Sequence, residues 1–148
     1  MTAHYLGRKL LSSQVEHPVV GRATVRVPGV CGELAQGMLG QHYFLITCPI
    51  DFFARVQVEL YQSGPSQDGP SIDAPANCPK AVQAMEATLE YLGRKDLSAR
   101  LTVSNPIPRS KGLGSSSADV AATVAATGLA LGRELVPEQV AEIALAVE

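Results

Sequence analysis

Four stretches of the chain have the patterns of β-strands. Polar and apolar residues alternate along the first, third and fourth stretches, and the second is rich in aromatic and β-branched residues. The stretches are residues 23–27, 43–48, 52–61 and 99–103. Within the third, Arg55, Gln57 and Glu59 are separated by apolar or small residues. Because successive side chains of a strand point to opposite faces, we expect a sheet with an apolar face and a solvated face.

Three later segments have the spacing of helices. Residues 79–92 place apolar side chains at helical intervals, with Pro79 at the first turn and Gly93 as a C-terminal stop. Residues 118–131 are nearly all Ala, Val, Leu and Thr around the whole circumference, which predicts a buried helix. Residues 137–147 predict a final amphipathic helix.

The order of these elements predicts an α+β fold, because a doubly wound parallel sheet would alternate strands and helices more strictly. Residues 1–22 lack periodicity and are expected to be loosely ordered, so the predicted domain covers residues 23–148. Residues 63–79 are dense in Gly, Pro, Ser and Asp, which predicts a surface loop.

Composition narrows the possible partners. The 148 residues suffice for one domain, with 46% hydrophobic and 18% charged residues and a net charge of -2. No broad positive field would gather nucleic acid or anionic lipid, and no apolar run predicts a signal peptide or membrane span. We therefore expect a cytoplasmic protein that binds neither nucleic acid nor membrane.

The three cysteines fit neither a disulfide framework nor a zinc site by number and spacing. No histidine partner accompanies Cys31 or Cys48. We expect both to be small buried residues without a chemical role.

The most informative segment, residues 106–118, lies between a predicted strand and the predicted buried helix. Gly112 and Gly114 permit backbone conformations and close approaches that a Cβ would block, so that backbone amides can converge on phosphate oxygens. Residues 115–117 are serines at the expected helix start, which adds hydroxyl groups and an oxygen for a magnesium ion. Lys111 adds a point charge.

Other interpretations of this segment remain open. The same residues also suit a tight turn followed by a serine-capped helix. The segment lacks the ending of a Walker loop and the third glycine of a dinucleotide fingerprint. A hydrolase nucleophile elbow at Ser116 is disfavoured, because every histidine (His4, His17 and His42) precedes it.

Residues 108–118 resemble the Pro-x-x-x-Gly-Leu-Gly-Ser-Ser signature of the GHMP kinases (galactokinase, homoserine kinase, mevalonate kinase and phosphomevalonate kinase). Residues 111–123, with the Ser-Ala-Asp continuation, are most similar to the L-threonine kinases of cobalamin synthesis, as are residues 28–37 and 47–51. The resemblance implies an N-terminal domain with a mixed or antiparallel sheet, helices on one face and a left-handed β-α-β crossover.

The resemblance also implies a site. The second serine of the signature, Ser116, would ligate magnesium together with a downstream glutamate, Glu148, and Ser116 and Lys111 would take part in catalysis. The ATP-phosphate contacts would come from Pro108, Lys111, Gly112, Leu113, Gly114, Ser115, Ser116 and Ser117. Glu33, Gln36 and Asp119 are substrate candidates, although a polar turn and a first-turn helix carboxylate explain the same residues.

The implied reaction is transfer of the ATP γ-phosphoryl group to the hydroxyl of L-threonine for cobalamin synthesis. A kinase of the homoserine or mevalonate type, or a non-catalytic nucleotide-binding fragment, is the alternative. The family's C-terminal domain is expected to be absent, so we expect a truncated chain that is inactive alone. An apolar surface left by that domain would favour a homo-oligomer.

Overall fold

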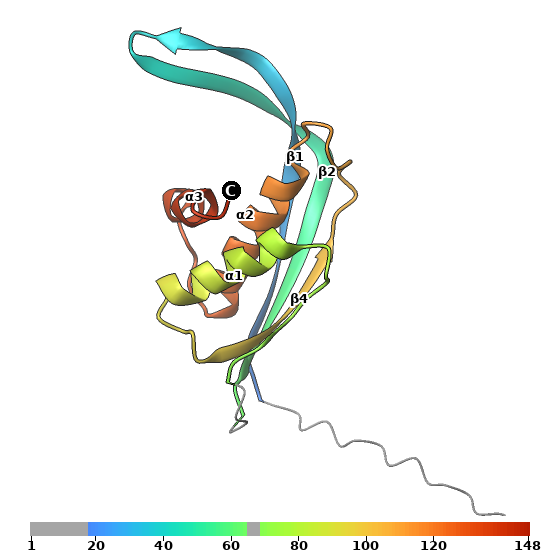
Figure 1. The fold of residues 1–148 in the computed structure, drawn as a ribbon, viewed down its shortest axis with the longest axis vertical. Coiled ribbons are helices and arrows are strands. Elements are labelled where there is room, and N and C mark those ends of the chain that lie inside the picture. The colour runs from blue at the N-terminus through green and yellow to red at the C-terminus, as the bar shows by residue number, and fades with distance from the viewer. Residues whose placement is uncertain (1–17, 65–68) are drawn as a thin grey trace, which may run out of the picture.

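The computed structural model describes residues 18–64 and 69–148. In these ranges a four-stranded sheet carries three helices on one face (Figure 1). The elements in chain order are β1 (Val19–Leu39), β2 (His42–Gln62), β3 (Ile72–Asp73), α1 (Pro79–Tyr91), β4 (Leu97–Ser104), α2 (Ser115–Ala130) and α3 (Pro137–Leu145).

The strands follow the order β1-β2-β4-β3 across the sheet. β1 pairs with β2 and β2 with β4 in antiparallel fashion, whereas the short edge strand β3 lies parallel to β4. Helix α1 joins the two parallel strands and so completes a β-α-β unit. The mixed sheet with its helices confirms the predicted α+β fold; the handedness of the crossover stays a prediction.

The core lies between the sheet and the first two helices. Val56, Val58 and Leu60 alternate along β2 and are fully buried against the helical layer. On the opposite face, Glu59 is the direct neighbour of Arg22 in β1 and Arg100 in β4. The alternation in the sequence therefore separates a buried apolar face from a charged one, as predicted.

Helix α2 is the central helix of the domain. It packs on the sheet and on α1, while α3 covers α1 and α2 on the side away from the sheet. Its buried hydroxyl groups are satisfied locally: Thr123 and Thr127 donate to the carbonyl groups of Asp119 and Thr123, each over 2.7 Å. The prediction of a buried helix is confirmed.

The strands are longer than predicted. β1 begins at Val19, before the predicted residue 23, and it continues through the predicted break at Pro28-Gly29. β2 likewise joins two predicted strands through Pro49. Register shifts absorb the irregular positions, as β-bulges do. Most of the predicted loose segment, residues 1–17, lies outside the described residues.

Beyond these register shifts the hairpin of β1 and β2 extends past the helices (Figure 1). We call residues 32–47 the arm. It exposes the large apolar side chains of Leu34, Met38, Leu39, Tyr43, Phe44, Leu45 and Ile46. The expectation of buried Cys31 and Cys48 is wrong, because both are exposed next to the arm, whereas Cys78 is buried.

Among the described helices, none is both long enough and apolar enough to span a bilayer.

Candidate phosphate-binding site

The loop between β4 and α2 holds its backbone in unusual conformations. Gly112 and Gly114 have φ angles of 68° and 66°, and Ser110 has a φ of 57°. Gly114 is the N-cap of α2 and has no side chain to cap the helix. The first amides of a helix have no acceptor within it, so the amides of residues 115–117 are available to a ligand.

A cavity of about 320 Å³ opens at this helix terminus. It is lined by Pro108, Arg109, Ser110, Gly112, Leu113, Gly114, Ser115, Ser116 and Ser117. The structure thus brings together every predicted phosphate-binding residue except Lys111. The side chain of Lys111 is exposed to solvent, and this residue is not part of the lining.

Strand β1 packs directly against the loop. The Val30 amide donates to the Leu113 carbonyl over 3.0 Å. A Cβ on Gly29 would lie 2.8 Å from that carbonyl oxygen, and one on Gly114 would lie 2.9 Å from Cγ2 of Val30. Both glycines are therefore needed for this close approach of strand and loop.

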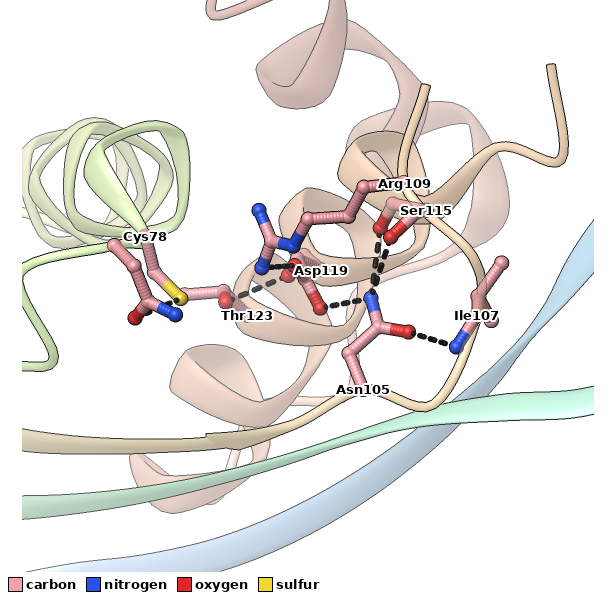
Figure 2. Close-up of polar contacts among 8 residues, drawn as sticks. Cys78, Asn105, Ile107, Arg109, Ser115, Asp119 and Thr123 are labelled. Atoms are coloured by element: carbon pink, nitrogen blue, oxygen red, sulfur yellow. Dashed lines mark hydrogen bonds and ion pairs between the residues drawn. The ribbon is translucent and has the colours of Figure 1, made fainter. Parts of the chain in front are cut away.

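The side chain of Asn105 links the end of β4 to the first turns of α2 (Figure 2). Its Nδ2 donates to the Ser115 carbonyl at 3.0 Å, to Ser115 Oγ at 3.2 Å and to Asp119 Oδ1 at 2.7 Å. Its Oδ1 accepts the Ile107 amide at 2.8 Å. Asn105 therefore fixes both ends of the phosphate loop relative to each other.

Asp119 is buried one turn inside α2, because the helix begins at Ser115 rather than at the predicted residue 118. The prediction that Asp119 lies in the first turn of the helix is therefore wrong, because it lies in the second turn. Burial raises the pKa of Asp119, and the hydrogen bond from Asn105 and the charge of Arg109, 3.7 Å away, oppose that rise. Asp119 acts on the loop through Asn105 and also borders a second cavity.

This second cavity, of about 220 Å³, shares Arg109 and Ser116 with the first. It is lined by Asn77, Cys78, Pro79, Lys80, Ala81, Arg109, Ser116 and Asp119. Nζ of Lys80 forms an ion pair with Glu148 Oε2 at 2.9 Å. Glu148 therefore approaches the rim of the second cavity through Lys80, although it does not line the cavity itself.

The two early substrate candidates lie elsewhere. Gln36 is on the arm, opposite Leu45 of β2, and Glu33 falls within the register shift between Cys31 and Ala35. The lining of the two cavities does not include Gln36.

Sequence reasoning missed three residues of this region: Asn105, Lys80 and Arg109. Asn105 was visible only as a strand terminator before Pro106, and Arg109 only as a variable position of the signature. No local signal marked Lys80, because its partner Glu148 is 68 residues away.

Comparison with known proteins agrees with this geometry. Residues 79–148 match the family described as GHMP kinases N terminal domain. The chain is 32% identical over 126 residues to an L-threonine kinase of Salmonella typhimurium, covering 85% of this chain and 40% of that protein. It is 30% identical over 141 residues to a homoserine kinase of Corynebacterium efficiens, covering 90% and 43% respectively. The chain thus spans less than half the length of these curated relatives.

Solved structures share the fold. A mevalonate kinase superposes with a TM-score of 0.64 at 20% identity, covering 84% of this chain and 46% of that one. A homoserine kinase from Cytophaga hutchinsonii gives 0.59 at 16% identity, covering 99% and 44%.

Proposed function

We propose, from the match of residues 79–148 to the GHMP kinases N terminal domain family, that the chain binds ATP with magnesium for phosphorylation of the L-threonine hydroxyl. The product would be O-phospho-L-threonine, for use in cobalamin synthesis. The observation that carries the proposal is the helix terminus at Gly114, whose uncapped amides border a cavity.

The phosphate groups of ATP would lie at this terminus. The amides of residues 115–117 would donate to phosphate oxygens, and the helix dipole favours negative charge there. Arg109 adds a guanidinium beside both cavities. Local donors of this kind suit a chain whose net charge is only -2.

The side chains near the loop offer oxygen ligands, which is the type of ligand that magnesium prefers. Ser116 supplies a hydroxyl oxygen at the boundary of the two cavities, and Glu148 supplies a carboxylate at the rim. The described residues contain no cluster of three or more His, Cys, Asp or Glu side chains that could hold a metal by themselves. Magnesium bound to nucleotides needs few protein ligands, since phosphates and water complete its shell. When bound, the ion would neutralise phosphate charge.

Catalysis by this chain would consist of positioning and charge stabilisation. In the proposed reaction the bond between the γ-phosphorus and the β,γ-bridging oxygen breaks, and ADP leaves with that oxygen. The threonine oxygen bonds to the phosphorus, and its proton passes to solvent. The loop amides and Arg109 would stabilise the charge on the phosphoryl oxygens. Asn105 would keep the amides aligned by holding Ser115 in place.

L-Threonine is proposed as the acceptor because the L-threonine kinase of Salmonella typhimurium matches 85% of the chain. The Corynebacterium efficiens homoserine kinase supports homoserine as a second candidate. Both acceptors are amino acids with a hydroxyl group, so a single assay can compare them.

Binding is tested first. Titration of the chain with ATP and magnesium should give a saturable heat signal, and Ser116→Ala should weaken it. Ser104→Ala makes the same change at an exposed serine of β4 outside both cavities, and should leave the affinity unchanged. Equal affinity in all three proteins would remove Ser116 from the site.

Turnover is tested by ADP release with threonine, homoserine, mevalonate or galactose as acceptor, both from this chain and from a longer protein that contains it. The proposal predicts the highest kcat/KM with threonine. ADP release dependent on mevalonate or galactose alone would contradict the acceptor assignment. ATP binding without ADP release from any acceptor would support a non-catalytic nucleotide-binding role instead.

A further inference from the structure

Two exposed cysteines face each other where the arm joins the body of the domain. Cys31 of β1 and Cys48 of β2 are direct partners in the antiparallel ladder, next to the pair Val30 and Pro49. Side chains of directly opposed residues lie on the same face of a sheet. The two sulfur atoms therefore start from adjacent positions on one surface.

The spacing of such a pair suits a disulfide. Opposed residues of antiparallel strands have Cα atoms about 4.5 to 5.5 Å apart, within the range of about 4.4 to 6.8 Å that disulfides span. We propose that Cys31 and Cys48 form a dithiol site that oxidises reversibly to a cross-strand disulfide at the base of the arm.

The local backbone can accommodate this bond. Register shifts flank the pair on both sides, between Pro28 and Val30 and between Cys31 and Ala35. A regular ladder would fix the strand spacing on both sides, whereas bulges permit local bending and twist. Both thiols are also open to a soluble oxidant.

Hydrogen peroxide serves as the oxidant in a balanced reaction. One thiolate attacks a peroxide oxygen, which forms a sulfenic acid and, with a proton, releases water. The second thiol attacks the sulfenic sulfur, the S–S bond forms, and a second water leaves. The two thiols lose two protons and two electrons in total, and the peroxide is reduced to two water molecules.

Closure would turn residues 32–47 into a covalent loop. Such a link removes conformations in which the two strands separate at the base of the arm. The amides of the arm should then exchange with solvent more slowly in the oxidised chain.

The experiment treats dilute chain with peroxide, alkylates the remaining thiols under denaturing conditions, and maps the peptides by mass spectrometry. We expect the intact mass before alkylation to fall by two hydrogen atoms, a peptide joining Cys31 to Cys48, and alkylation of Cys78. Dithiothreitol should reverse the change. Cys78→Ser, which removes the buried thiol, should behave identically.

The single variants Cys31→Ser and Cys48→Ser should keep the circular dichroism spectrum of the native chain but lose the two-hydrogen change. Oxidation of the native chain only to sulfinic acids, or to disulfides between two chains, would overturn the proposal. A linked peptide with unchanged hydrogen exchange in residues 32–47 would overturn the predicted restriction of the arm.

Discussion

Asn105 donates a hydrogen bond of 2.7 Å to the buried carboxylate of Asp119, from a position just beyond the last residue of β4. The same amide group also reaches the carbonyl and hydroxyl of Ser115. One side chain thus joins the strand, the phosphate loop and the second turn of α2. These hydrogen bonds help to hold the loop in its orientation.

Replacement of Asn105 should therefore destabilise the domain. Asn105→Ala removes the hydrogen bonds that join Asn105 to the Asp119 carboxylate and to the Ile107 amide. We expect the free energy of unfolding to fall by about 1–3 kcal/mol, the usual cost of an unsatisfied buried polar group. Urea denaturation measures the change. Asn77→Ala is the control for stability, at an exposed asparagine whose Oδ1 accepts, among the described residues, only a weak bond of 3.4 Å from the neighbouring Cys78 thiol. Equal midpoints for the two variants would contradict the role of Asn105.

Stability should depend on pH through Asp119. Burial raises its folded-state pKa above the ordinary value of 3.8, so the folded chain binds the proton more tightly than the unfolded chain. The stability that this proton binding contributes is present below the ordinary pKa and is lost as the pH rises through the folded pKa.

Asp119→Asn removes this titration. In urea denaturation from pH 3 upward, the free energy of unfolding of the native chain relative to Asp119→Asn should decrease with rising pH. The comparison separates Asp119 from Glu59, whose pKa is lowered chiefly by the Tyr61 hydrogen bond and whose stability contribution is lost as the pH falls. A difference that is flat with pH would contradict the burial argument.

The two glycines of the loop should differ in their tolerance of a side chain. Both have positive φ, so alanine at either position costs about 1–2 kcal/mol in backbone strain. At Gly114 the new Cβ would also lie 2.9 Å from Cγ2 of Val30, whereas at Gly112 it would meet no atom within 4 Å. We expect Gly114→Ala to be the less stable variant in thermal unfolding and the weaker ATP binder. The reverse order would contradict the packing of β1 against the loop.

The sequence predicts the α+β class, the three helices and the position of the glycine-rich loop before α2, because each follows from local periodicity and glycine placement. It fails at Pro28-Gly29 and Pro49, where local signals predict strand ends. The paired strands continue there, because hydrogen bonds on either side outweigh the irregular positions, which become register shifts.

The contacts that support the site could not be predicted from the sequence, because they depend on how distant elements pack together. The bonds of Asn105 to Ser115 and Asp119 depend on how β4 meets α2, and the pairing of Lys80 with Glu148 depends on how α1 meets α3. Neither contact produces a periodic pattern in the amino-acid sequence. The exposure of Cys31 and Cys48 likewise follows from the position of the arm, which the composition of the strands does not reveal.

The apolar surface of the arm should cause self-association. Met38 and Tyr43 are cross-strand partners, and they are 59% and 74% exposed. We expect light scattering at rising concentration to give a mass above the 15.6 kDa of one chain. The double variant Met38→Glu, Tyr43→Lys keeps a favourable cross-strand pair while removing apolar area, and should remain monomeric. A native mass of one chain throughout the concentration range would refute this prediction.

Glu148 should affect nucleotide binding only when magnesium is present. Its carboxylate pairs with Lys80 beside the cavity that Ser116 borders. Glu148→Gln removes the charge, so the gain in ATP affinity on adding magnesium should shrink, while affinity in EDTA stays the same.

The control is Glu90→Gln, which breaks a comparable surface ion pair with Lys95, at 2.8 Å, at the other end of α1. Surface pairs contribute little to stability, so both variants should unfold at nearly the same temperature. Equal loss of affinity with and without magnesium would assign Glu148 to the support of Lys80 rather than to the metal.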